Sequence, residues 1–154
     1  MNEDYKRAYS YALYLLDEKS YSAAKMRDKL SAKYSGAVAE SVVGRLTAEG
    51  YINDFKFASH AAEYMREVKK FGAYRIKQEL LAKGIDRETV LDVCKTLDSD
   101  ETEAIKARIR KNYSDKLGTP AGEQKIQAAM SRYGFKFSDV SRALRELKEE
   151  LITN

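Results

Sequence analysis

The stretch Lys-Lys-Phe-Gly-Ala-Tyr-Arg-Ile-Lys-Gln-Glu-Leu-Leu-Ala-Lys-Gly-Ile, residues 69–85, decides the fold. Its apolar residues Ile76 and Leu80 are four positions apart, so they lie on one face of a helix. Gly72 stands before this helix and Gly84 stands after it, where glycine commonly allows the backbone to leave the helical conformation. The stretch therefore predicts one helix of about three turns with an apolar inner face and a basic outer face.

The same pattern occurs again on either side of this stretch, at a shift of about 50 residues. The shift aligns residues of similar chemistry: Tyr5, Phe55 and Ile105; Ser22, Gly72 and Gly122; Met26, Ile76 and Ile126; and Leu30, Leu80 and Met130. A three-helix unit of this length is marginally stable alone, and stacked units would bury the faces that one unit leaves open. We therefore expect an all-α protein, an elongated and curved array of three tandem three-helix repeats over residues 1–53, 54–99 and 100–154.

Helix boundaries are indicated by residues that cap helix ends. Ser22, Asp86 and Ser138 have side chains that accept hydrogen bonds from first-turn N–H groups, and Thr119-Pro120 combines such a cap with proline at the first helical position. Gly36 is expected to end the second helix with a positive φ. No stretch alternates apolar and polar residues for long enough to predict a strand.

The composition restricts the class of protein. The chain has 154 residues, 34% of them charged, with one proline, one cysteine and a formal net charge of +4. One cysteine excludes an internal disulfide, and an inward helix position predicts a core role for Cys94. We see no signal peptide and no apolar run of about 20 residues, so we expect a cytoplasmic protein with no membrane-spanning part. His60, the single histidine, is predicted to lie at the surface.

No catalytic or cofactor motif is present. The sequence has no glycine-rich phosphate loop, no paired-histidine metal motif, and no nucleophile placed with a base and an orienting group. We therefore expect a protein that is not an enzyme and that needs no cofactor and no metal.

The candidate functional residues are basic side chains and one tyrosine of the stretch 69–85, and basic side chains that spread around the helix expected over about residues 101–116. A modest positive charge fits an acidic partner, although a solvated helix face explains the same residues. Among the aromatic residues, Tyr51 and Phe55 are expected to pack the first repeat on the second. The candidate partner-binding residues are Lys69, Lys70, Tyr74, Arg75, Lys77, Lys83, Lys106, Arg108, Arg110 and Lys111.

Four segments of the chain follow one another in a recognisable order: Tyr21-Ser22 with Met26-Arg27-Asp28-Lys29-Leu30, then Gly50 to Ala58, then Lys69 to Ile85, and finally Tyr133-Gly134-Phe135 with Asp139-Val140. Together these segments resemble the RecX family, which comprises bacterial regulators of the RecA recombinase. Lys70, Phe71 and Ala73 depart from the family pattern, where Gly, Tyr and Pro are common.

The resemblance implies tandem three-helix repeats and direct binding to RecA. It also implies that the protein occupies the groove of the RecA–DNA filament as a monomer and modulates, mostly inhibits, the recombinase, ATPase and coprotease activities. Weak direct binding to DNA is compatible with the basic residues. Two alternatives stay open: a helix-turn-helix-like module that binds nucleic acid without RecA, with its turn at Gly84, and a helical-repeat adaptor for another protein.

Overall fold

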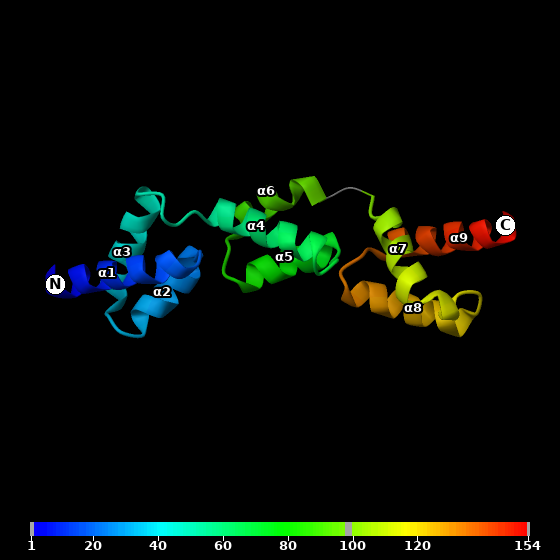
Figure 1. Ribbon diagram of the computed structural model, residues 1–154, viewed down its shortest axis with the longest axis horizontal. Coiled ribbons are helices and arrows are strands. Elements are labelled where there is room, and N and C mark those ends of the chain that lie inside the picture. The colour runs from blue at the N-terminus through cyan, green and yellow to red at the C-terminus, as the bar shows by residue number, and fades with distance from the viewer. Residues whose placement is uncertain (1, 98–99, 154) are drawn as a thin grey trace. The chain divides into compact units, whose positions relative to one another are not determined.

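The computed structural model describes residues 2–97 and 100–153, over which the chain forms nine α-helices, two short 3₁₀ turns and no strand (Figure 1). The predicted all-helical class is confirmed, and in chain order the α-helices make three successive sets of three. The helices are α1 (Asn2–Glu18), α2 (Ala23–Ser31), α3 (Gly36–Ala48), α4 (Asp54–Glu67), α5 (Ala73–Ala82), α6 (Arg87–Cys94), α7 (Thr102–Asn112), α8 (Pro120–Arg132) and α9 (Phe137–Thr153), and the 3₁₀ turns are η1 (Lys95–Leu97) and η2 (Ser114–Lys116).

The helices group into two compact units that divide the middle set. The first unit takes the described residues of 1–63 together with Glu79–Val93, and the second takes Tyr64–Gln78 together with the described residues from Cys94 onward. Both α4 and α5 therefore contribute one part to each unit. The repeat boundaries at residues 53 and 99 stay predictions, and residue 99 lies outside the described residues.

In the first unit, α1, α2 and α3 enclose one apolar core (Figure 1). Met26 and Leu30 of α2 are fully buried because their spacing of four places both on one face of the helix. An aspartate joins the beginning of α4 to this core: the Asp54 carboxylate accepts a hydrogen bond of 2.8 Å from the backbone N–H of Ala23, at the start of α2. The side chain of Asp54 thus satisfies one of the free N–H groups at that helix end.

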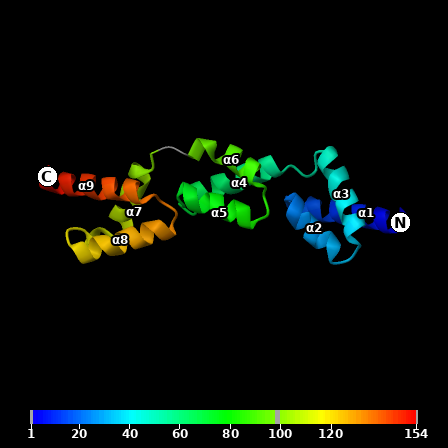
Figure 2. The same ribbon diagram turned by 180° about the vertical axis from the view of Figure 1, so that it is seen from behind.

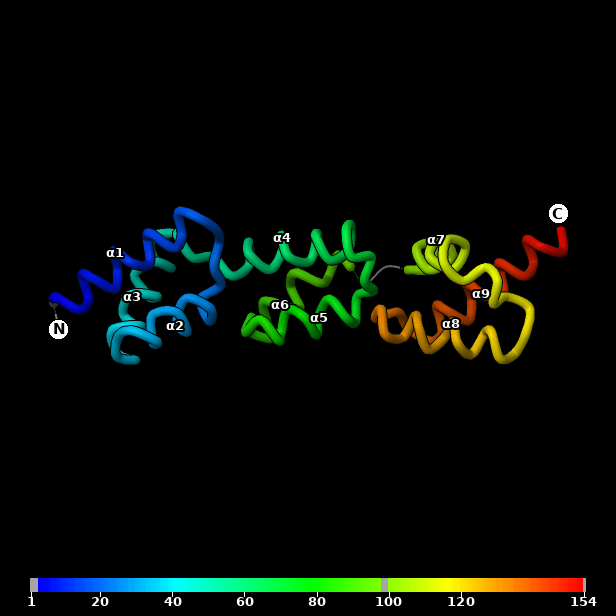
Figure 3. Tube along the Cα trace, turned by 60° about the horizontal axis from the view of Figure 1, so that its bottom comes forward, coloured from blue at the N-terminus to red at the C-terminus, as the bar shows by residue number. Residues whose placement is uncertain are grey.

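In the second unit, α9 packs on α7 and α8 over a core that includes Ile105, Ile126, Met130 and Val140 (Figure 2). The chain reverses direction between α8 and α9 (Figure 3) at Gly134, whose φ of 96° is one that glycine adopts without strain. This turn is important for the site, because residues 72–75 are bound to it.

The predicted caps are largely confirmed. Ser22 accepts from the N–H of Lys25 at 3.1 Å, Asp86 from Thr89 at 2.9 Å, and Thr119 from Gly122 at 3.1 Å, with Pro120 at the first position of α8. The last helix begins at Phe137, so Ser138 lies inside α9 rather than before it.

Several predictions about single residues are wrong. Gly36 does not end α2 with a positive φ; it is the first residue of α3, and Ser35 caps that helix. The sequence predicts Val68 on the apolar face of a helix over about residues 54–70, but the helix stops at Glu67 and Val68 is exposed beyond its end. Tyr51 and Phe55 are also more than half exposed, so they do not form a buried contact.

The remaining structural predictions concern isolated side chains and the membrane. Cys94 is buried, and His60 is exposed, as predicted. Across the described ranges we find no helix of the length and apolarity that a bilayer crossing requires. Within the same ranges, no three potential metal ligands come together.

Candidate partner-binding cleft

A cleft of about 370 Å³ lies in the second unit, between α7 and the segment that joins α4 to α5. Alanines of α7 and the side chains of Val68 and Phe71 provide its apolar surface, and basic side chains surround it. The lining residues are Arg66, Val68, Lys69, Lys70, Phe71, Ala104, Ala107, Arg108, Lys111, Asn112 and Phe135.

The segment that forms one wall of the cleft has an unusual backbone. After α4 ends, the N–H of Phe71 donates to the carbonyl of Met65 at 3.0 Å, and the chain between them turns through Lys70 at a φ of 60°. Lysine rarely adopts this left-handed conformation, because its Cβ approaches the following carbonyl. The turn places the side chains of Lys69 and Lys70 in solvent at the edge of the cleft.

Arg108 holds this turn against α7. Its Nη2 donates to the backbone carbonyls of both Lys69 and Lys70, each at 3.1 Å. The guanidinium also lies over the ring of Tyr133, 3.6 Å from the ring centroid. A planar guanidinium with several donors suits this combination of two carbonyls and one aromatic face. Arg108 therefore positions the wall of the cleft.

The beginning of α5 is bound to the turn between α8 and α9. The N–H of Gly72 donates to the carbonyl of Tyr133 at 2.6 Å, and the N–H of Tyr74 donates to the carbonyl of Gly134 at 3.2 Å. The backbones come so close that a Cβ on Gly72 would lie 2.4 Å from the carbonyl oxygen of Gly134. Glycine is needed at residue 72 for this close approach.

Arg75 reinforces the same contact. Its guanidinium lies 3.9 Å from the centroid of the Phe71 ring, and its Nη1 donates to the carbonyl of Arg132 at 3.1 Å. Arg75 was predicted as a partner-binding residue, and the structure places it in an intramolecular role at this position.

Behind the cleft, the carboxylate of Glu101 is buried, with 5% of the residue exposed. It accepts a hydrogen bond from the N–H of Ala73 at 3.2 Å and forms an ion pair with Arg66, whose Nη2 also donates to the carbonyl of Leu97 at 3.2 Å. A carboxylate is favourable at the first turn of a helix, where N–H groups lack partners. Glu101 also neutralises the positive charge of Arg66, which belongs to α4 and lines the cleft.

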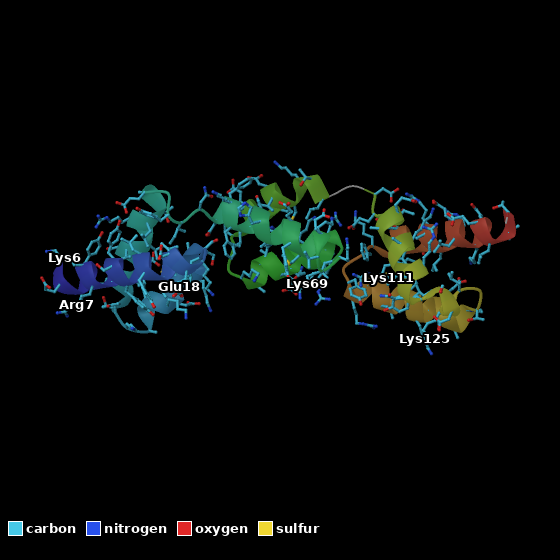
Figure 4. All side chains as sticks on the ribbon, in the orientation of Figure 1. Lys6, Arg7, Glu18, Lys69, Lys111 and Lys125 are labelled. Carbon is cyan, nitrogen blue, oxygen red and sulfur yellow. The ribbon has the colours of Figure 1, made fainter. Side chains whose placement is uncertain are left out.

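Three of the predicted residues surround the cleft as exposed ammonium groups: Lys69, Lys70 and Lys111. Figure 4 labels Lys69 and Lys111 in this unit. Within the described part of the chain, none of the three forms an ion pair with a carboxylate. Among residues 2–97 and 100–153, no acidic side chain lines the cleft, so the field of the described lining is positive.

The other predicted basic residues of α7 face α9. Lys106 is buried, and its Nζ lies 2.7 Å from Glu146, 3.1 Å from Glu103 and 3.3 Å from Glu150. Hydrogen bonds to Glu146 and then Glu103 raise the pKa of Lys106 above its ordinary value. Arg110 binds the second oxygen of Glu150 at 2.6 Å and, as the main cause, lowers the pKa of that carboxyl. Both positive charges are therefore compensated inside the unit.

The last predicted residues lie outside the cleft. Tyr74 is 63% exposed, and Lys77 is partly buried. Lys83 belongs to the first unit, where it lines a separate cleft together with Lys19 and Lys25. Arg75 belongs to the second unit and lies within α5, whereas Lys83 follows the end of that helix and belongs to the first unit.

The sequence pattern does not indicate the role of Glu101, the contact of Gly134 with the start of α5, or the two lysines that accompany Lys83. Glu101 stands beside a helix start in the sequence, where an acidic residue usually stabilises the first turn of its own helix. Its side chain instead reaches α5, and nothing in the local sequence indicates this partner. The spacing of four between Glu146 and Glu150 was a usable signal for an acidic face on α9.

Comparisons with known proteins agree on one family. The family models for the first and second three-helix domains of RecX match residues 8–46 and 53–93. "Regulatory protein RecX" of Thermus thermophilus is 37% identical over 103 residues, covering 67% of this chain and 71% of that protein. The protein of the same name from Trichlorobacter lovleyi is 31% identical over 144 residues, covering 90% and 93%.

The fold comparison gives the same result. The crystal structure of RecX from Lactobacillus salivarius matches with a TM-score of 0.85, at 23% identity, over 96% of this chain and 99% of that one. At this level of identity the likeness shows the shared fold.

Proposed function

The chain belongs to the RecX family, and we propose that it binds RecA and the RecA–DNA filament and inhibits the recombinase, ATPase and coprotease activities by occupying the filament groove. It acts by binding rather than by catalysis, in the cytoplasm, as a monomer and without a cofactor. Membership of a family of regulatory proteins supports the regulatory role.

The observation that carries the proposal is the cluster of uncompensated charge around the cleft. Lys69, Lys70 and Lys111 are exposed, and the described residues of the lining include no carboxylate to neutralise them. Because Arg75 and Arg108 are engaged in holding the segment in place, we assign them to positioning and the three lysines to contact. Tyr74, Lys77 and Lys83 extend the proposed contact set, whereas Lys106 and Arg110 act mainly on the stability of α7 and α9.

The test is the DNA-dependent ATPase activity of the cognate RecA at increasing concentrations of this protein. We expect inhibition, and we expect the double variant Lys69→Glu with Lys111→Glu to need about tenfold more protein for half-inhibition, since two charges change sign at the contact. Lys125→Glu is the matched control, because Lys125 is exposed on α8 of the same unit and outside the cleft lining (Figure 4). No inhibition by the wild-type protein and no co-sedimentation with filaments would refute the proposal.

An alternative is a module that binds DNA without RecA. In its favour, α5–α6 and α8–α9 are helix pairs joined by short turns with glycine at positive φ, at Gly84 and Gly134. A gel-shift assay over a salt series separates the two functions. Tight, sequence-selective binding without RecA supports the alternative, whereas weak binding that falls steeply with salt is expected from the basic residues in either case.

A further inference from the structure

We propose that the cleft between α7 and the α4–α5 segment binds an acidic peptide segment of a partner protein, with one aliphatic side chain inserted into the cleft. The flanking carboxylates of that segment bind Lys69, Lys70 and Lys111. This inference deepens the proposed function, on which it rests, because it assigns this part of the contact to protein rather than to DNA.

The apolar surface of the cleft argues for an aliphatic side chain. Val68 is 61% exposed, and Ala104 and Ala107 are exposed on the same side of α7, where they line the cleft. A volume of about 370 Å³ lies near the lower end of the range of about 300–1,000 Å³ that is usual for ligand pockets. Such a cleft suits one side chain and its neighbouring backbone, and burial of that side chain removes apolar surface from water on both partners.

The aromatic rings of the cleft argue against nucleic-acid bases. Single-stranded nucleic acid gains much of its binding energy by stacking bases on open aromatic faces. The Phe71 ring has the Arg75 guanidinium over one face, and Phe135 is only 6% exposed. The two rings of the lining are thus poorly placed for stacking, and the alanines and the valine provide no stacking surface.

The charges around the cleft argue for carboxylates. Lysine carries a compact charge on a flexible chain, which adapts to carboxylates at several positions along a peptide. Arg66 is neutralised by Glu101, so the positive field around the cleft comes from the three lysines together with Arg108, whose partners are neutral carbonyls and a ring. Electrostatic complementarity of this kind mainly speeds association and selects partners, while the apolar contact supplies most of the residence time.

The experiment is a nuclear magnetic resonance titration of the full chain, labelled with ¹⁵N, with the peptide acetyl-Glu-Asp-Leu-Asp-Glu-amide. We expect shifts of the amide signals of Val68, Ala104, Ala107 and Lys111. The same peptide with Ser in place of Leu should bind about tenfold more weakly, because it loses the apolar contact. No shift at these amides, or equal binding of the two peptides, would overturn the inference.

Two variants connect the titration to the cleft. Ala107→Glu places a carboxylate inside the cleft and should abolish the shifts, whereas Ala128→Glu changes an exposed residue of α8 outside the lining and should leave them intact. Oligo-dT of equal charge, titrated without the peptide, should not shift the amide signals of Ala104 and Ala107, because it has no aliphatic side chain to insert between them. Shifts of these two signals by oligo-dT that are lost in Ala107→Glu would assign the cleft to DNA and overturn the inference.

A second copy of this chain is the remaining occupant to test. Residues 149–152, Glu-Glu-Leu-Ile, combine acidic residues with the exposed Leu151 and Ile152. If the protein associates with increasing concentration in sedimentation, and Ala107→Glu abolishes this association, residues 149–152 of a second copy occupy the cleft and the inference of a separate partner protein is overturned. If the protein stays a monomer at all concentrations, the inference of a separate partner protein is supported.

The ATPase assay keeps the two proposals apart. Inhibition of RecA by a protein that does not bind the peptide refutes the inference and leaves the function standing. Peptide binding by a protein without effect on RecA refutes the function and leaves the cleft assignment standing.

Discussion

Glu101 closes the first turn of α5 by accepting a hydrogen bond from the N–H of Ala73, 28 positions earlier in the chain. Because the same carboxylate binds Arg66, one side chain connects the end of α4, the start of α5 and the region before α7. The segment that forms the cleft wall lies between the two groups that Glu101 holds. The stability of this wall should therefore depend on a residue that does not line the cleft.

We expect Glu101→Ala to lower the free energy of unfolding by about 3 kcal/mol, because it leaves Arg66 without its carboxylate and the N–H of Ala73 without an acceptor in a buried place. Glu149→Ala is the control, since Glu149 is exposed and a surface change of this kind is usually within about 0.5 kcal/mol. Urea denaturation followed by circular dichroism measures both. A loss below about 1 kcal/mol for Glu101→Ala would contradict the role assigned to this carboxylate.

The turn at Gly134 gives a prediction that separates backbone conformation from steric contact. Gly118 and Gly134 have similar positive φ values, 94° and 96°, but a Cβ at Gly118 meets open space, whereas a Cβ at Gly134 would lie 2.5 Å from the backbone nitrogen of Arg75. Gly118→Ala should cost about 1 kcal/mol, which is the penalty for the left-handed conformation. Gly134→Ala should cost at least about 3 kcal/mol, because α5 must also move away from the turn.

Thermal denaturation of the two glycine variants tests this difference. If both variants lose the same stability, the close approach of α5 to the α8–α9 turn contributes nothing. If Gly134→Ala is destabilised more than Gly118→Ala, and RecA inhibition falls only in Gly134→Ala, the geometry of the wall is needed for function.

Much of the fold was predictable because its determinants are local. A cap such as Ser22 or Asp86 acts on an N–H three residues away, and the spacing of Ile76 and Leu80 is a property of one helix. The wrong predictions are of two kinds: helix ends, at Gly36 and Ser138, and the exposure of side chains. Val68 and Tyr51 have the residue types of a core, but whether a neighbour covers them depends on tertiary packing that a single sequence does not show.

The candidate site was predictable in part for the same reason. The excess of basic residues around Lys69 is visible in the sequence, but which of these charges remain uncompensated depends on distant partners. Lys106 is neutralised by carboxylates about 40 positions later, and Arg108 binds carbonyls of residues 38 and 39 positions earlier. A list of basic residues therefore mixes contact residues with residues that hold the structure together.

The Lys106 cluster predicts a pH dependence with two limits. The pKa of Lys106 is raised above its ordinary 10.5, so its contribution to stability is complete below pH 10.5 and is lost as the pH rises through the folded-state pKa. The pKa of Glu150 is lowered below its ordinary 4.5, so its contribution is complete above pH 4.5 and is lost as the pH falls through the folded-state pKa.

Replacement of Glu150 should remove its loss of stability at low pH, and replacement of Lys106 should remove its loss of stability at high pH. As the pH is lowered from 5 to 3, the melting temperature of Glu150→Gln should fall less than that of the wild-type protein. As the pH is raised above 10.5, the melting temperature of Lys106→Met should fall less than that of the wild-type protein. Both variants should be less stable than the wild-type protein near neutral pH, because each leaves opposite charges without a partner. Wild-type-like slopes in both variants would show that the cluster does not control the pH dependence.

Lys70 allows charge and backbone conformation at the cleft to be tested separately. Its φ of 60° is tolerated by glycine and asparagine and opposed by β-branched residues. Lys70→Asn should therefore leave stability within about 1 kcal/mol of the wild-type value, whereas Lys70→Val should lower it by about 1–2 kcal/mol, although both remove the same charge. Both variants should inhibit RecA less than the wild-type protein, because each removes one of three ammonium groups. Lys69→Gln is the control, because it also removes one charge but residue 69 does not have a positive φ. Its stability and its inhibition of RecA should match those of Lys70→Asn. If Lys70→Val is as stable as Lys70→Asn, the left-handed turn is not maintained in solution, and the cleft wall has another conformation.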